Sequence, residues 1–198
     1  AGGQSSLMML PTYIKPPDEI KFRRPVIAID AGGTNVRIAR VFFQESGHPV
    51  IRDFACYPMP GSNGPVSRAA FFDSLASFVN PYIRGGENLG FCFSYPLAMQ
   101  PDRDGRLLTF SKEIKAKEVE GSLIGEGLRR ALSSRGCASV GDIVLLNDTV
   151  ATLLSGRSMS SRPYDSYIGF ILGTGTNCCY IEENVNIATL ADNPGKGR

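Results

Sequence analysis

Two short turns rich in glycine and threonine carry the clearest chemical signal in this sequence. The first is "DAGGTN", which begins at Asp30, and the second is "LGTGTN", which ends at Asn177. Glycine lets backbone N–H groups approach and surround a phosphate, and a threonine hydroxyl adds a further donor. A plain hairpin turn explains either copy alone, but two copies favour a pair of phosphate sites. Neither copy matches the Rossmann fingerprint, and no Walker A motif occurs.

An acid at the exit of an apolar run is the second signal, in "VLLNDTVATLL". Ligands of α/β proteins gather beyond the carboxyl ends of strands, where Asp148 could act as a general base that takes a proton from a hydroxyl group. The alternative, favoured by the local pattern alone, is that Asn147 or Asp148 only caps the helix that follows.

Hydrogen-bonding side chains in two further segments could hold a polyhydroxylated ligand. Ser94 lies in "FSYP" at another predicted strand exit, and Ser111 and Lys112 lie in "FSKEIK" after a turn at residues 102–105. Ordinary surface loop chemistry is the alternative for each of these three residues.

Hydrophobic periodicity predicts the elements that would position these motifs. Apolar β-branched runs indicate strands, and apolar residues at helical spacing indicate helices, which Pro81 and Gly156 would end. The predicted strands cover residues 26–30, 35–43, 50–59, 88–94, 142–146, 167–173 and 177–183, and the predicted helices cover 67–80, 118–132 and 148–156. The first five strands predict an α/β fold with a mixed five-stranded sheet flanked by helices.

The order of the elements predicts a complete domain and the start of another. Residues 1–24 are expected to form an arm and residues 25–157 one domain. Residues 158–198 begin with the same strand–turn–strand pattern, which is a weak internal repeat. Because a lone hairpin is marginally stable in water, we expect the chain to be part of a longer protein.

Composition excludes several classes of partner. A net charge of +2 over 198 residues is too small to favour nucleic acid as the main partner. No apolar run approaches the roughly 18 residues of a membrane span, and no convincing signal peptide is present. The five cysteines lack disulfide-framework or metal-ligand spacing, which indicates a reducing cytoplasm.

Taken together, these motifs resemble the hexokinase family over nearly the whole chain. The matching segments, in the family's order, are "LMMLPTYI", "IDAGGTNVRIARV", "GFCFSYP", "FSKEIK", "LLNDTVATLL" and "IGFILGTGTNCCYIEE". The resemblance implies a ribonuclease-H-like, actin-like ATPase fold with two lobes around a cleft. It also implies Mg²⁺- and ATP-dependent phosphorylation of the 6-hydroxyl of glucose or a related hexose, in glycolysis.

The resemblance further implies a role for individual residues. Asp148 would be the catalytic base, and Asp30 would hold Mg²⁺, through water. The implied hexose contacts are Ser94, Ser111, Lys112, Asn147 and Asn177. The implied ATP phosphate sites are Gly32, Gly33, Thr34, Asn35 and Arg37 in the first turn, and Gly173, Thr174, Gly175 and Thr176 in the second.

The sequence departs from the family pattern at a few positions. Ser111 replaces a usual threonine, Glu113 a common glycine, and Ala151 a frequent glycine. The family's larger lobe would follow Arg198, so we expect this chain to have little activity without it.

Three alternatives remain at this point: a bacterial ROK-type sugar kinase, a non-catalytic sugar sensor on a kinase fold, and an actin- or chaperone-like nucleotide switch.

Overall fold

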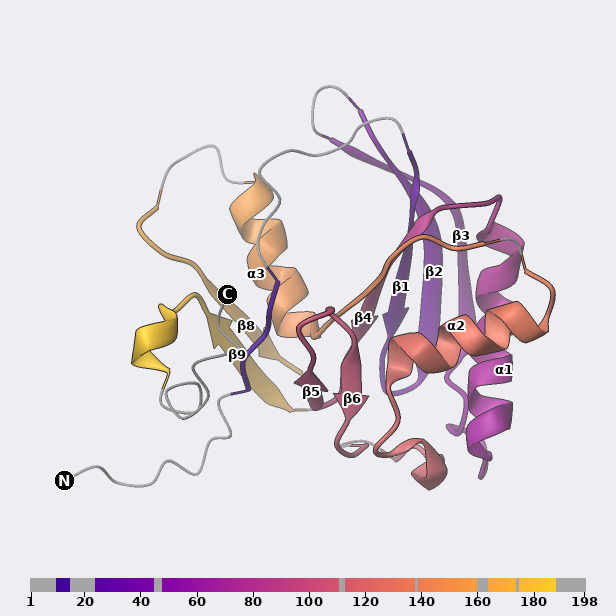
Figure 1. The fold of residues 1–198 in the computed structure, drawn as a ribbon. Helices are drawn as coiled ribbons and strands as arrows, with labels where there is room; N and C mark the ends of the chain where they lie inside the picture. The colour runs from indigo at the N-terminus through magenta and orange to yellow at the C-terminus, as the bar shows by residue number, and fades with distance from the viewer. Residues whose placement is uncertain are drawn as a thin grey trace. The chain divides into compact units, whose positions relative to one another are not determined.

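The computed structural model describes residues 10–14, 24–44, 48–110, 113–137, 139–159, 164–173 and 175–187. These form two compact units, one comprising Tyr13–Asp148 and the other Thr149 onward together with residues 10–12. Figure 1 shows the elements of both units along the chain. The predicted lobe boundary after residue 157 stays a prediction.

A mixed five-stranded sheet forms the centre of the first unit and confirms the predicted fold class. Its order is β3-β2-β1-β4-β7. β1 pairs antiparallel with β2, and β2 with β3, whereas β1, β4 and β7 run parallel. The strands are β1 (Val26–Ala31), β2 (Asn35–Phe43), β3 (Pro49–Pro58), β4 (Asn88–Phe93) and β7 (Ile143–Leu146).

One face of this sheet is the core of the unit, because buried residues alternate along its strands. In β1, Ile27 and Ile29 are buried, and in β4 Leu89 and Phe91 are buried. The intervening residues of both strands face the other side and are less buried. Asp30 and Cys92 belong to this second set, so the chemistry-bearing residues of the strands do not compete with the core.

Two helices cover the core face, α1 (Arg68–Val79) and α2 (Ile124–Ser134), and they pack beside each other (Figure 1). Ser67 caps α1 by accepting a hydrogen bond from the N–H of Ala70 at 3.2 Å. As predicted, the α-helix ends before Pro81, which lies in the short 3₁₀-helix η1 (Asn80–Tyr82).

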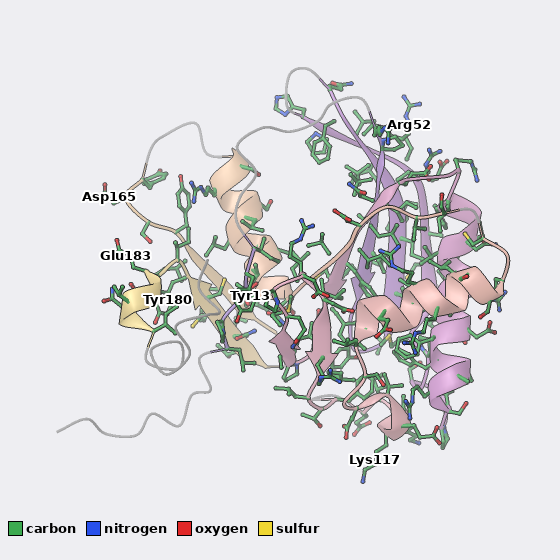
Figure 2. The ribbon with its side chains drawn as sticks, viewed as in Figure 1. Tyr13, Arg52, Lys117, Asp165, Tyr180 and Glu183 are labelled. Atoms are coloured by element: carbon green, nitrogen blue, oxygen red, sulfur yellow. The ribbon has the colours of Figure 1, made fainter. Side chains whose placement is uncertain are left out.

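The predicted helix over residues 118–132 is in fact two elements. A 3₁₀-helix, η2 (Lys117–Val119), comes first, and α2 begins only at Ile124. Gly121 lies between them with a φ of +79°, a left-handed conformation that ends helical structure. Figure 2 shows Lys117 pointing outward from η2.

A short hairpin after β4 was not predicted from the sequence. β5 (Leu97–Met99) pairs antiparallel with β6 (Gly105–Leu107), and the turn predicted at residues 102–105 connects them. The hairpin leads from the end of β4 to the segment that precedes residues 111–112.

The second unit contains α3 (Asp148–Met159 in full), the hairpin of β8 (Ile168–Leu172) and β9 (Thr176–Tyr180), and η3 (Asn184–Asn186). α3 extends three residues beyond the predicted end at Gly156. Apolar side chains of the hairpin, including Ile168 and Leu172, are 74% and 78% exposed. None of the helices in the described part of the chain has the length and apolar character that a membrane span requires.

Candidate functional site

The carboxyl ends of β1 and β7, with β4 between them, bring the predicted site residues Asp30 and Asp148 to one edge of the sheet. Asp30 pairs in register with Arg37 on one side and with Cys92 on the other. Cys92 pairs with Leu146, the last residue of β7, and Asp148 follows two residues later. Because parallel strands end at the same edge, Asp30 and Asp148 converge on the thiol between them.

The thiol of Cys92 lies close enough to both carboxylates to be affected by their charges. Asp30 is the neighbour of Cys92 in the adjacent strand, and Ser94 lies two residues further along the chain. Burial, together with the negative charges of Asp30 and Asp148, raises the pKa of the Cys92 thiol to about 12. The thiol therefore stays protonated at neutral pH and is a poor nucleophile.

The first glycine–threonine turn is held at both ends by backbone hydrogen bonds. Gly32 N–H donates to the carbonyl of Asn35 at 2.9 Å, which closes the turn, and Met59 N–H donates to the carbonyl of Thr34 at 2.8 Å. Thr34 is exposed, and its hydroxyl accepts from the Asn35 amide at 3.2 Å. The turn is thus a fixed loop with accessible polar groups, as an anion site requires.

Arg37, a predicted phosphate contact, forms an ion pair with Asp30. Its guanidinium nitrogen lies 3.0 Å from one carboxylate oxygen of Asp30, and the two side chains are 49% and 44% exposed. At this exposure the pair contributes little to stability. It does place a positive and a negative group together at the mouth of the first turn.

A magnesium ion fits the donor set at this edge. Mg²⁺ keeps several waters and is commonly bound by one or two carboxylates plus substrate phosphates rather than by an all-protein cage. Asp30 presents a half-exposed carboxylate beside the first turn. Among the described residues, no group of three or more His, Cys, Asp or Glu side chains could hold a metal ion by itself. Waters and substrate phosphates would therefore supply the other ligands.

Asn147 and Asp148 lie at the junction of β7 and α3, both half-buried. Asp148 is the first residue of α3, and Asn147 immediately precedes the helix, at its N-cap position. A carboxylate in the first turn of a helix is stabilised by the helix dipole. The position therefore suits both the capping alternative and the general-base prediction.

The second glycine–threonine turn connects β8 and β9 in the second unit. Gly173 N–H donates to the carbonyl of Gly175 at 3.0 Å, and Thr176 is exposed. Asn177, a predicted hexose contact, donates from its amide to the hydroxyl of Thr149 at 3.3 Å, next to Asp148 in sequence. The two turns belong to different units, and their binding of ATP phosphates stays a prediction.

Three predicted site residues, Ser111, Lys112 and Thr174, lie outside the described residues. The chain on both sides of residues 111–112 is anchored. Phe110 N–H donates to the Glu120 carboxylate at 3.1 Å, and Lys115 N–H donates to the carbonyl of Gly61 at 2.9 Å.

Two residues near the site were not assigned a role from the sequence. Cys92 could have been found from its alternation with buried Phe91 and Phe93, which places it on the Asp30 face. Tyr95 follows Ser94, and its hydroxyl donates to the carbonyl of Gly32 in the first turn at 2.8 Å. No sequence pattern predicts the contact between Tyr95 and Gly32, because it joins segments far apart in the chain.

Comparison with known proteins gives consistent matches across this region. The sequence model of a family described as hexokinase matches residues 1–158. Mouse hexokinase-3 is 32% identical over 98% of this chain and 21% of its own length, and hexokinase-1 of Schizosaccharomyces pombe is 33% identical over 92% and 38%. The chain thus spans about a fifth to two fifths of these relatives.

Solved structures agree with the sequence matches. A hexokinase from Schistosoma mansoni, complexed with glucose, has a TM-score of 0.81 at 29% identity and covers 94% of this chain and 42% of its own. A polyphosphate/ATP-glucomannokinase from Arthrobacter, at 18% identity and a TM-score of 0.59, covers 80% of this chain and 58% of its own and shares the fold.

Proposed function

Because the chain belongs to the hexokinase family, we propose that the protein transfers the terminal phosphoryl group of ATP to the 6-hydroxyl of glucose or a related hexose in the cytoplasm. The observation that carries the proposal is the position of Asp30, Ser94 and Asp148 at the carboxyl ends of the parallel strands β1, β4 and β7, where both carboxylates affect the pKa of the Cys92 thiol. The family match over residues 1–158 favours this reaction over the ROK-type alternative.

Asp148 is the proposed general base. Phosphoryl transfer has a loose transition state, so catalysis depends on positioning and charge stabilisation. Asp148 would accept a hydrogen bond from the 6-hydroxyl, orient its oxygen towards the phosphorus and take its proton as the new bond forms. Its place at the start of α3, beyond β7, fixes the carboxylate on two regular elements.

Asp30 and the first turn are proposed to meet the phosphates. Asp30 would hold Mg²⁺ through water; the ion supplies charge neutralisation on the phosphate oxygens when bound. The backbone N–H groups of Gly33 and Thr34, with the Arg37 guanidinium, would bind phosphate oxygens beside it. Residues 173–176 would contribute a second set of backbone donors from the other unit.

The remaining predicted residues are proposed to hold the hexose. Ser94, Ser111, Lys112, Asn147 and Asn177 offer hydroxyl, ammonium and amide groups of the kind that bind sugar hydroxyls. Ser94 is half-buried beside Cys92, and Asn147 precedes Asp148. A hexose bound to these groups would exclude water, which otherwise competes as phosphoryl acceptor.

A coupled ADP-release assay of the full-length protein tests the proposal. Wild type is measured with ATP, Mg²⁺ and a panel of hexoses, beside Asp148→Asn. We expect hexose-stimulated ADP release in wild type and a fall in kcat of about 100-fold or more in the variant, because general bases contribute roughly 10²–10⁴-fold.

Asp142→Asn is the matched control. Asp142 directly precedes β7, at the strand's other end, with a 69% exposed side chain paired with Arg103. Its variant should keep wild-type kcat. Near-normal kcat in Asp148→Asn would refute the base, and wild type that releases no ADP with any hexose would favour the sugar-sensor alternative.

A further inference from the structure

Resting on the proposed function, we infer that Tyr95 is a positioning residue for both ligands. Its hydroxyl fixes the first glycine–threonine turn. Its ring joins that turn to the segment ending at Phe110, directly before the predicted hexose contacts Ser111 and Lys112. Tyr95 is 1% exposed, so it does not touch substrate itself. It would act through the two segments that its hydroxyl and its ring contact.

The hydroxyl of Tyr95 holds the first turn directly. It donates to the carbonyl of Gly32 at 2.8 Å, a normal distance for a strong O–H···O bond. The N–H of the same Gly32 closes the turn onto Asn35 at 2.9 Å. Because both the N–H and the carbonyl of Gly32 are held, the backbone N–H groups that follow are fixed in orientation. These are the groups proposed to bind phosphate.

The backbone beside Tyr95 strengthens this connection. Ser94 N–H donates to the carbonyl of Ala31 at 3.1 Å. Consecutive residues of the β4 exit therefore bind consecutive carbonyls of the β1 exit, Ala31 and then Gly32. Ser94 is also a predicted hexose contact, so a change in the Ser94–Tyr95 segment would reach both ligands.

The ring of Tyr95 contacts the other segment. Its centroid lies 4.9 Å from that of Phe110 in an edge-to-face arrangement and 4.8 Å from that of Phe93. Aromatic pairs of this geometry contribute about 0.5–1.5 kcal/mol beyond burial. Phe110 is further held by Glu120, and Ser111 follows it in sequence, so one buried side chain links the two segments.

Tyr95→Phe in the full-length protein separates the hydroxyl from the ring. We expect KM for ATP to rise about 3- to 10-fold, the effect of losing one hydrogen bond. KM for the hexose should stay within about 1.5-fold, because the ring contact with Phe110 is retained. Hydrogen exchange of the backbone amides of residues 32–35 should become faster, since the turn loses its anchor.

Tyr82→Phe is the matched control, since it removes the same atom from another buried tyrosine, whose hydroxyl faces that of Tyr57 at 3.5 Å. It should change neither KM for ATP nor exchange at residues 32–35. Unchanged exchange at these residues in Tyr95→Phe overturns the inference, and so does faster exchange with an unchanged KM for ATP. If wild type phosphorylates no hexose, the proposed function fails, and the exchange comparison alone still decides whether Tyr95 fixes the turn.

Discussion

Asp104 caps α2 from outside the helix, and its substitution should destabilise the first unit markedly. The carboxylate is buried and accepts hydrogen bonds from Gly105 N–H at 2.6 Å, Gly125 N–H at 2.7 Å and Glu126 N–H at 2.9 Å. The last two belong to the first turn of α2, whose N–H groups have no partner within the helix. Asp104→Ala leaves them without this acceptor.

The magnitude follows from these bonds. Each buried donor left unsatisfied costs about 1–3 kcal/mol, and an ordinary cap contributes about 1 kcal/mol. We expect Asp104→Ala to lower the free energy of unfolding by about 2–4 kcal/mol. Asp104→Asn keeps one acceptor oxygen and should lose roughly half as much.

Urea unfolding followed by circular dichroism at 222 nm measures this loss, and hydrogen exchange at Gly125 and Glu126 localises it. Asp142→Asn removes a carboxylate from an exposed ion pair and should cost under about 1 kcal/mol. If Asp104→Ala stays within about 0.5 kcal/mol of wild type, the cap is not the structural element described here.

Three further predictions concern charge, packing and reactivity. Burial alone would raise the pKa of Glu87, but backbone N–H groups of residues 84 and 85 and a nearby arginine lower it on balance. The carboxylate therefore stabilises the fold above its ordinary pKa of 4.5, and this contribution is lost as pH falls below that value. The urea midpoints of wild type and Glu87→Gln should differ at pH 7, and the difference should shrink as pH falls below 4.5. Gly127→Ala would place a methyl group against an aromatic ring of α1 and should cost about 1–3 kcal/mol. Its matched control Gly156→Ala, in open space on α3, should instead be neutral or stabilising by up to about 1 kcal/mol in the same unfolding experiment. In limited iodoacetamide labelling at pH 7.5, mass spectrometry should find the exposed Cys56 modified well before Cys92, whose thiol is only partly exposed and has a raised pKa. Equal labelling of both thiols would contradict this difference.

The sheet was predictable because its strands contain apolar runs of at least four residues bounded by turn residues. The strand predicted over 35–43 matches β2 at both ends, and the predicted mixed five-stranded sheet is confirmed. The β5–β6 hairpin escaped prediction because each strand has only three residues, too few to show a period. The helix predicted over 118–132 extended too far, since the apolar spacing continues through Gly121 although its backbone cannot remain helical.

The candidate site was predictable where it depends on strand ends. Asp30 and Asp148 each follow an apolar run, and parallel strands bring such ends together. The contacts of Cys92, Tyr95 and Asp104 depend instead on register and packing between segments far apart in the chain, which periodicity cannot reveal. Their side chains are also ordinary core types or turn residues, so composition offers no signal either.

The position of β7 in the sheet sets the order in which the site is completed during synthesis. β1, β2 and β3 are neighbours in sequence and can pair as they leave the ribosome, whereas β4 and β7 join through long connections that contain α1 and α2. β7 is an edge strand and is the last strand of the five-stranded sheet to be synthesised. Asp148 lies two residues after β7, so the nascent protein contains the first glycine–threonine turn and Tyr95 before it gains the proposed proton acceptor. We expect folding intermediates that lack β7 to retain the turn and to be catalytically silent.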